Sequence, residues 1–210
     1  MKALHALTLA AAMMISAPSL GQKPLKSLSQ LRDGDLLFQT SSQSNAITSV
    51  TKGIANYAID HVGIYHLHDG KPMVIEASYD GVREVAYEQF VSQSPLTLAG
   101  RVKGRTDIQA TLSKAHSYIG NPYDYLYQAD ERAIYCSELV LLSYTDKKGN
   151  AIFQPTGMTF RDSSGQISPW WQDYYSRRMH EVPEGQPGSN PGELSRRENL
   201  KIKYIIQILE

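Results

Sequence analysis

The chain has 210 residues, with 21 basic and 21 acidic side chains and a single cysteine. The balanced charge offers no basic excess for nucleic acid or for an anionic membrane surface, so we expect neither as a partner. One cysteine excludes an internal disulfide framework, and the length suits one domain with its own core.

The first 21 residues have the pattern of a secretory signal peptide. Lys2 and His5 precede an apolar run at 7–15, and small residues follow at 17–21. This run is shorter than the roughly 20 residues that span a bilayer. We therefore expect cleavage after Gly21, a single mature domain at 22–210 with no transmembrane segment, and a periplasmic or secreted location in a bacterium.

Apolar periodicity and turn residues predict an antiparallel sheet with several helices. Strands are expected at 36–39, 60–67, 72–78, 81–85, 96–102 and 201–209, with the strands at 81–85 and 96–102 paired. Helices or helical turns are expected within 41–57, at 87–91, at 108–119 and from residue 136 onwards. Together these elements indicate an α+β domain.

Two further stretches are interpreted from composition. Aromatic residues at 170, 171, 174 and 175 are expected to form core or a cleft wall. The segment 182–199 is rich in Pro, Gly, Ser and charge, which predicts a surface loop. Whether that loop covers a site stays open.

A tight hairpin places one histidine close to one carboxylate. A two-residue turn at Asp69 and Gly70 sets Gly63 opposite Glu76. His61 then lies on the same face as Glu76, as a diagonal neighbour roughly 7 to 8 Å away along the backbone, within reach of a long side chain. A bulge or a longer turn would change this arrangement.

Cys136 begins an apolar helical segment and has three possible roles: an inert core residue, an intermolecular linker or a nucleophile. The start of a helix favours the thiolate, which is the reactive form. His61 would hold the thiol proton and Glu76 would orient the imidazole, provided that the helix packs on this part of the sheet. The alternatives are a core or edge histidine and a solvent-exposed carboxylate.

The sequence indicates neither a metal site nor a cofactor site. His66 and His68 share one strand face near the turn, whereas His61 points to the other, so the three do not form a metal-ligand set. The sequence contains neither a phosphate-binding glycine loop nor a Cys/His zinc spacing. We expect no metal and no cofactor.

A series of ordered motifs resembles the permuted papain-like amidases of the YiiX-like family, which are circularly permuted relatives of the NlpC-type cell-wall peptidases. The resemblance covers about residues 31 to 145. Its motifs are Asp33-Gly34-Asp35-Leu36-Leu37-Phe38, Asp60-His61-Val62-Gly63-Ile64-Tyr65, Val74-Ile75-Glu76-Ala77, Gly120-Asn121-Pro122-Tyr123-Asp124-Tyr125 and Tyr135-Cys136-Ser137-Glu138-Leu139-Val140.

The resemblance implies a circularly permuted papain-like fold, with an antiparallel sheet or partly open barrel packed against the helix that carries the cysteine. It implies Cys136 as nucleophile, His61 as general base and acid, and Glu76 as the residue that orients His61. Tyr123 and Tyr135 are further candidates for substrate binding or oxyanion support, and the Cys136 backbone N–H for the oxyanion itself.

The implied function is an exported cysteine amidase or peptidase with a peptide or acyl substrate. The leading substrate is an amide bond in peptidoglycan stem peptides, by analogy with the NlpC-type enzymes. One alternative is a thiol hydrolase or acyltransferase acting on lipid acyl chains. Another is a cell-wall or lipid binding module without turnover.

Overall fold

The computed structural model describes residues 23–128 and 131–207. The predicted signal peptide at 1–21 therefore lies outside the described residues. Within the described part of the chain, no helix is long and apolar enough to cross a bilayer.

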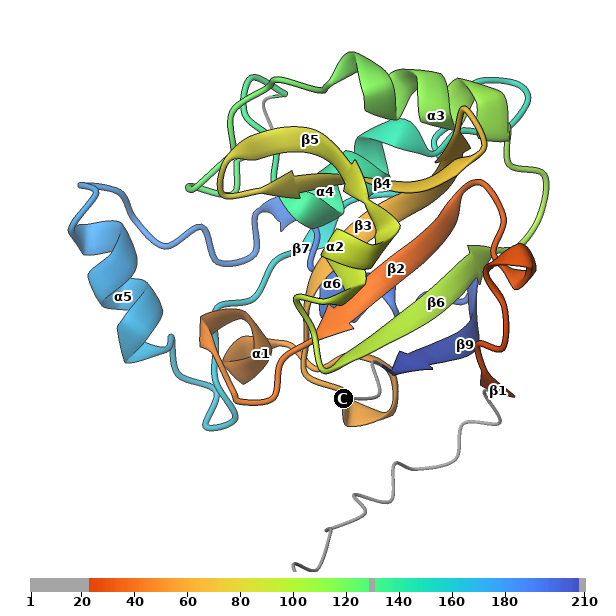
Figure 1. Cartoon of the computed structure of the whole chain (residues 1–210). Coiled ribbons are helices and arrows are strands. Elements are labelled where there is room, and N and C mark those ends of the chain that lie inside the picture. The colour runs from red at the N-terminus through yellow and green to blue at the C-terminus, as the bar shows by residue number, and fades with distance from the viewer. Residues whose placement is uncertain (1–22, 129–130, 208–210) are drawn as a thin grey trace, which may run out of the picture.

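A sheet of seven strands forms the centre of the described structure (Figure 1). Its spatial order is β1-β9-β6-β2-β3-β4-β5, and all neighbours are antiparallel except β1 and β9. The strands are β1 (Lys23–Pro24), β2 (Asp35–Thr40), β3 (Ile59–His68), β4 (Lys71–Ser78), β5 (Gly81–Ala86), β6 (Leu96–Val102) and β9 (Leu200–Gln207). The sheet is open and does not close into a barrel.

Strand β2 shows why the sheet is covered on both sides. Leu36, Leu37 and Phe38 are all fully buried, and successive side chains of a strand point to opposite faces. Leu36 and Phe38 join the core beneath the cysteine helix, whereas Leu37 joins a second core on the other face. The continuous apolar run in the sequence therefore reflects a strand buried between two layers.

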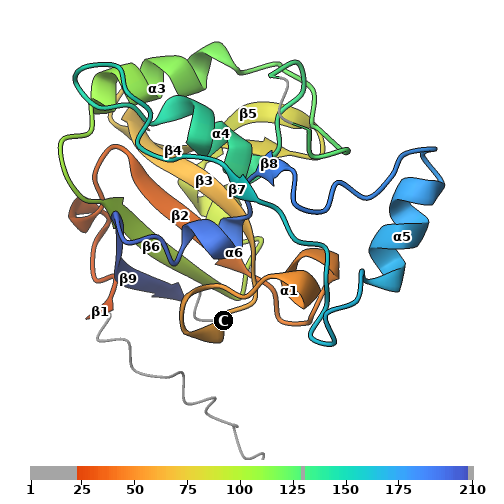
Figure 2. The ribbon, with the colours of Figure 1, turned by 180° about the vertical axis from the view of Figure 1, so that it is seen from behind.

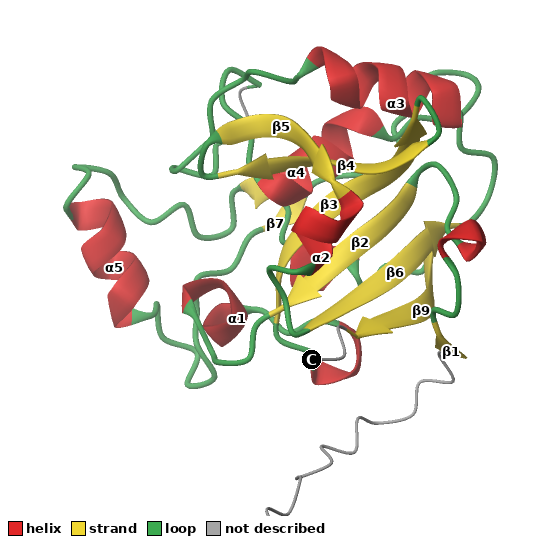
Figure 3. Cartoon of the chain, viewed as in Figure 1, coloured by secondary structure: helices red, strands yellow, loops and turns green. Residues whose placement is uncertain are grey.

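Six α-helices of the described chain surround the sheet (Figures 2 and 3). They are α1 (Ala46–Val50), α2 (Tyr87–Val91), α3 (Ile108–Ser117), α4 (Cys136–Ser143), α5 (Pro169–Ser176) and α6 (Pro191–Leu194). Helices α3, α4 and α6 lie on one face and α2 on the other, while α5 stands to one side (Figures 1 and 2). Short 3-10 helices, η1 and η2, lie at Leu28–Gln30 and Ile54–Asn56, and a small second sheet pairs β7 (Thr156–Gly157) with β8 (Pro187–Gly188).

The expected helix within 41–57 is shorter than predicted. Asn45 caps α1 through its side chain, which accepts hydrogen bonds from the backbone N–H groups of Ile47 and Thr48. The helix ends at Val50, and Ala55 has a left-handed backbone with φ 48°. The apolar spacing is helical, but the extended backbone of Thr51, with φ −140° and ψ 130°, ends the helix, and Ala55 prevents a second continuous one.

The predicted pairing of the strands at 81–85 and 96–102 is wrong. Strand β5 pairs with β4, whereas β6 pairs with β2 and β9. Between them, α2 buries Tyr87, Phe90 and Val91 on the sheet. The chain therefore crosses the sheet face before it enters β6 and does not turn back on β5.

The segment 182–199 is also more ordered than predicted. It contains β8 and α6, and the Leu194 side chain is fully buried. Asn190 caps α6, with Pro191 in its first turn. An Asn-Pro pair is a helix-start signal, and the prediction of a loop from composition did not take this pair into account.

Candidate active site

The β3–β4 hairpin brings His61 and Glu76 together. Its register pairs Gly63 with Glu76 and His68 with Lys71, as the two-residue turn predicts. Nε2 of His61 and Oε2 of Glu76 are 2.6 Å apart. The bulge in the β2–β3 pairing near Thr40 does not disturb this hairpin, so the predicted contact is present.

Glu76 is a fully buried carboxylate held from two sides. Arg83, directly opposite on β5, donates from Nε to Oε1 of Glu76 at 3.0 Å and also contacts Asp80 at 3.0 Å. Burial alone would raise the pKa of Glu76. The hydrogen bonds and positive charges of His61 and Arg83 outweigh burial and hold that pKa below its usual range.

Sequence reasoning missed Arg83, although a signal was present. Strands β4 and β5 are joined by another two-residue turn, at Tyr79 and Asp80, which sets Arg83 opposite Glu76. The same register argument that paired His61 with Glu76 would have found it.

Cys136 occupies the first position of α4 and is almost fully buried. Helix α4 packs against β3 and β4, which is the condition that the sequence left open. The side chain of His61 is hydrogen-bonded to Cys136 as well as to Glu76. Because Nε2 of His61 is taken by Glu76, Nδ1 is the ring nitrogen left for the thiol.

Opposing effects act on the pKa of His61. Burial lowers its pKa, but the hydrogen bonds and charges of Cys136 and Glu76 more than offset burial and raise the pKa to about 10. His61 is therefore an imidazolium at neutral pH. A positive charge beside a thiol favours the nucleophilic thiolate.

Tyr123 lies in the wall of the pocket that Cys136 lines, together with Tyr127. The two tyrosine side chains are hydrogen-bonded to each other, and burial raises the pKa of Tyr123. Tyr127 was not predicted, although the alternation of tyrosines at 123, 125 and 127 could have drawn attention to it. Both hydroxyls are protonated at neutral pH and can donate hydrogen bonds.

Gly81 fixes the start of the segment that carries Tyr123. It has φ +101°, and a Cβ atom at this position would lie 2.4 Å from the carbonyl oxygen of Asn121. Val82 donates its backbone N–H to that same oxygen at 2.9 Å. The close approach therefore requires glycine and ties the segment to the start of β5.

Tyr135 supports the cysteine helix from behind. The backbone N–H of Ser189 donates to the Tyr135 hydroxyl at 3.0 Å, and the hydroxyl groups of Ser189 and Ser137 are 2.9 Å apart. The segment 182–199 thus contacts the first turn of α4. This packing indicates a positioning role for Tyr135, although its ring also lines the pocket.

The pocket beside Cys136 is mainly apolar and aromatic. Its wall is formed by Ile47, Val50, Tyr123, Tyr127, Tyr135, Met158, Phe160 and Trp171, with polar groups from Ser137, Thr159, Ser189 and Asn190. The indole of Trp171 donates to the carbonyl of Ala46 at 3.0 Å. The aromatic cluster of α5 is thus both core and cleft wall.

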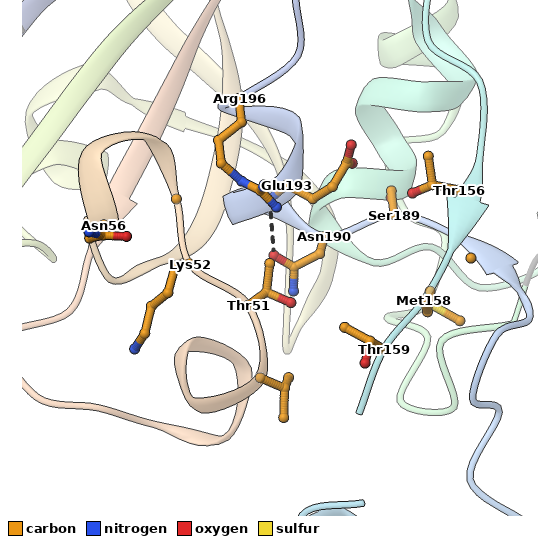
Figure 4. Close-up of a pocket in the computed structure, with 13 residues that line it drawn as sticks. Thr51, Lys52, Asn56, Thr156, Met158, Thr159, Ser189, Asn190, Glu193 and Arg196 are labelled. Atoms are coloured by element: carbon orange, nitrogen blue, oxygen red, sulfur yellow. Dashed lines mark hydrogen bonds between the residues drawn. The ribbon is translucent and has the colours of Figure 1, made fainter. Parts of the chain in front are cut away.

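Two more depressions adjoin this pocket. His61 lines one of them with polar neighbours that include Gln39 and Ser78. Figure 4 shows the other, a polar groove that shares Ser189 and Asn190 with the aromatic pocket. The cysteine and histidine therefore stand between an apolar pocket and a polar depression.

Comparisons with known proteins bear on the family and the fold of this chain. A family model described as "Permuted papain-like amidase enzyme, YaeF/YiiX, C92 family" matches residues 30–202. The YiiX protein of Escherichia coli strain K12 is 26% identical over 175 residues, which are 80% of this chain and 81% of that protein. The crystal structure of YiiX from Escherichia coli O157:H7, described as a metalloprotein, superposes with a TM-score of 0.68 at 22% identity, covering 83% of this chain and 99% of that chain.

Proposed function

Because this chain belongs to the permuted papain-like amidase family, we propose that it is a cysteine hydrolase in which Cys136 is the nucleophile. The observation that carries the proposal is the buried chain of contacts from Cys136 through His61 to Glu76. Arg83 completes it as a positioning residue, because it holds the carboxylate that orients His61.

The chemistry follows from these positions. The thiolate of Cys136 attacks the substrate carbonyl carbon, and the imidazolium of His61 gives its proton to the leaving amine or alcohol. His61, now neutral, takes a proton from water, which hydrolyses the thioester and releases the acid. Glu76 stabilises the imidazolium before the first step and after the second.

The start of α4 supplies a site for the oxyanion. Tyr135 at the N-cap makes no side-chain capping hydrogen bond, so the cap does not compete for the backbone N–H groups of the first turn. The N–H of Cys136 and the positive end of the helix dipole stabilise negative charge beside the sulfur. Tyr123 is proposed as an additional hydroxyl donor at the edge of the pocket.

The proposed substrate is an amide bond in a peptidoglycan stem peptide. Support comes from the family's relation to the cell-wall peptidases and from the signal-like segment at 1–21, which together favour an exported enzyme in the periplasm. The polar groove of Figure 4 includes Lys52 and Arg196, whose positive charges can bind the carboxylates of a peptide.

A specific observation favours a second candidate, which is the hydrolysis or transfer of a lipid acyl chain. The pocket beside Cys136 is walled mainly by aromatic and aliphatic side chains. Such a wall favours an apolar acyl group over the small and charged residues of a stem peptide. The two candidates share the same thiol chemistry and differ in the group that enters this pocket.

One experiment separates the candidates. The mature protein and Cys136→Ala are incubated with purified muropeptides and, separately, with phospholipid vesicles, and the products are identified by mass spectrometry. New stem-peptide fragments made only by the wild type support the amidase. Released or enzyme-bound acyl chains support the lipid candidate, and equal products from both proteins would overturn the cysteine mechanism.

A further inference from the structure

A cluster of histidines and a carboxylate lies at the other end of β3 from the active site. It consists of His66 on β3, Glu84 on β5 and His116 on α3, and one potential ligand atom of each residue lies within 4.8 Å of the other two. His66 shares its strand face with Val62 and Ile64, which belong to the core that α3 covers. The cluster therefore joins two strands to a helix.

The closest pair in the cluster is a buried imidazole nitrogen and a carboxylate oxygen. Nε2 of His66 and Oε1 of Glu84 are 2.8 Å apart, yet both atoms are buried without a hydrogen-bond partner. The His66 residue is only 2% exposed. A buried nitrogen and a buried oxygen at this distance can share a proton, or can both coordinate an ion that lies beside them.

The third member converges on the same oxygen. Nε2 of His116 is 3.8 Å from Oε1 of Glu84, and the rings of His116 and His66 stand at 86° to each other with centroids 4.9 Å apart. An edge-to-face arrangement is common in ring packing, and here Nε2 of both imidazoles faces the same carboxylate oxygen, Oε1 of Glu84. The donors therefore meet at one point.

His68 holds the carboxylate from its other side. Its Nδ1 bonds to Oε2 of Glu84 at 2.8 Å, which leaves Oε1 facing His66 and His116. A carboxylate that is oriented through its second oxygen is a common outer-shell feature of metal sites. His68 is half exposed and lies where solvent reaches the cluster.

From this juxtaposition we infer that His66, Glu84 and His116 form a binding site for a divalent transition-metal ion of the zinc class. Two imidazole nitrogens and a carboxylate oxygen are the donors such ions prefer, in preference to calcium or magnesium. A tetrahedral ion with bonds of about 2.0 to 2.1 Å holds its ligands roughly 3.4 Å apart. The observed separations of 2.8 and 3.8 Å bracket that value.

The site is separate from the proposed catalytic residues. His61 and His66 are five positions apart on β3, which is about 16 Å along a strand. The ion would cross-link β3, β5 and α3 and would stabilise the fold without touching substrate. Sequence reasoning missed it because it compared only histidines near one another in the chain, whereas Glu84 and His116 come from other elements.

Metal content measured on the purified full-length protein tests the inference. The protein is stripped with a chelator, loaded with zinc and dialysed, and zinc is quantified by inductively coupled plasma mass spectrometry. We expect about one equivalent for the wild type and a raised melting temperature on loading. A second readout replaces zinc with cobalt, whose visible absorption reports a four-coordinate site.

The variants are chosen to keep the fold. Glu84→Gln preserves the shape of the side chain, and His116→Ala alters a partly exposed helical residue. Each is expected to lower zinc affinity about 100-fold or more, and His68→Ala about 10-fold. The matched control is His180→Ala, which removes an exposed histidine outside the cluster and should bind zinc like the wild type.

Two results would overturn the inference. One is a wild-type protein that retains no zinc after loading and shows no shift in melting temperature. The other is a Glu84→Gln variant, folded by circular dichroism, that retains zinc and the cobalt spectrum of the wild type. Neither result bears on Cys136, so the proposed hydrolase stands or falls separately.

Discussion

Replacing Glu76 by Gln removes the negative charge beside His61 while keeping an oxygen that can accept its N–H. In the wild-type protein Nε2 of His61 lies 2.6 Å from the carboxylate, and both groups are largely buried. We expect the variant to fold and to retain the orientation of the imidazole. It should nevertheless stabilise the imidazolium less, which weakens the positive charge that favours reaction of the neighbouring thiol.

The size of the effect can be bounded from the site. Raising the pKa of His61 from 6.5 to about 10 corresponds to about 5 kcal/mol of preference for the imidazolium. Cys136 and Glu76 both contribute to this stabilisation of the imidazolium. Exchanging a charge-assisted hydrogen bond for a neutral one costs about 1 to 2 kcal/mol, so Cys136 should react about 5- to 30-fold more slowly near pH 7.

The assay is alkylation by iodoacetamide followed by mass spectrometry, which needs no substrate. Because Cys136 is the only cysteine, every carbamidomethyl group reports on it. The rate is measured from pH 5 to pH 10, and the rates of variant and wild type should converge well above the pKa of an ordinary thiol, about 8.5. Glu88→Gln, which removes an exposed charge on α2, is the matched control.

Equal alkylation rates for Glu76→Gln and the wild type across pH 6 to 8 would refute the reasoning, provided that the control also reacts normally. Slower alkylation in the Glu88→Gln control would show instead that net charge, and not the contact with His61, sets the rate. Nuclear magnetic resonance titration of His61 gives an independent check, since its pKa should fall in the Glu76→Gln variant.

Three further predictions concern the same region. Cys136→Ala and His61→Ala should each abolish turnover with the native circular dichroism spectrum retained; turnover in folded Cys136→Ala would contradict its role as nucleophile. The raised pKa of His61, about 10 in the folded protein against 6.5 as its ordinary value, stabilises the fold fully below pH 6.5. This stabilisation is lost as the pH rises through 10, so between pH 7 and 10 urea unfolding should show a loss of a few kcal/mol, at most about 5, that His61→Gln does not show. Gly81→Ala places a Cβ atom 2.4 Å from the Asn121 carbonyl oxygen, whereas Gly104 has a similar positive φ and open space around it; Gly81→Ala should therefore lower the free energy of unfolding by about 1 to 3 kcal/mol more than Gly104→Ala, and equal losses would rule out the close approach as the cause.

The parts of the site that could be predicted are local in the chain. A two-residue Asp-Gly turn fixes the register of the hairpin, and the alternation of side chains then places His61 beside Glu76. The apolar residues that follow Cys136 indicated its helix for the same reason. In both cases the positions of nearby residues depend only on secondary-structure geometry.

The parts that could not be predicted depend on contacts between distant segments. Strand β6 pairs with β2 and β9 because the chain crosses the sheet face at α2. No local sequence pattern predicts that crossing. Ser189 reaches the first turn of α4 from more than 50 positions away in the chain. Tertiary packing brings such residues together. Which distant segments pair, and in what register, does not follow from the local pattern of one sequence.

The position of the last strand has a consequence for how the protein is made. Strand β9 lies between β1 and β6, and it pairs Tyr204 with Lys23 and Ile205 with Pro24. A growing chain therefore carries Cys136, His61 and Glu76 long before it can complete the sheet. Because β9 lies between β1 and β6, the seven-stranded sheet cannot be completed before residues 200–207 have been made, and its assembly depends on contacts between segments far apart in the chain.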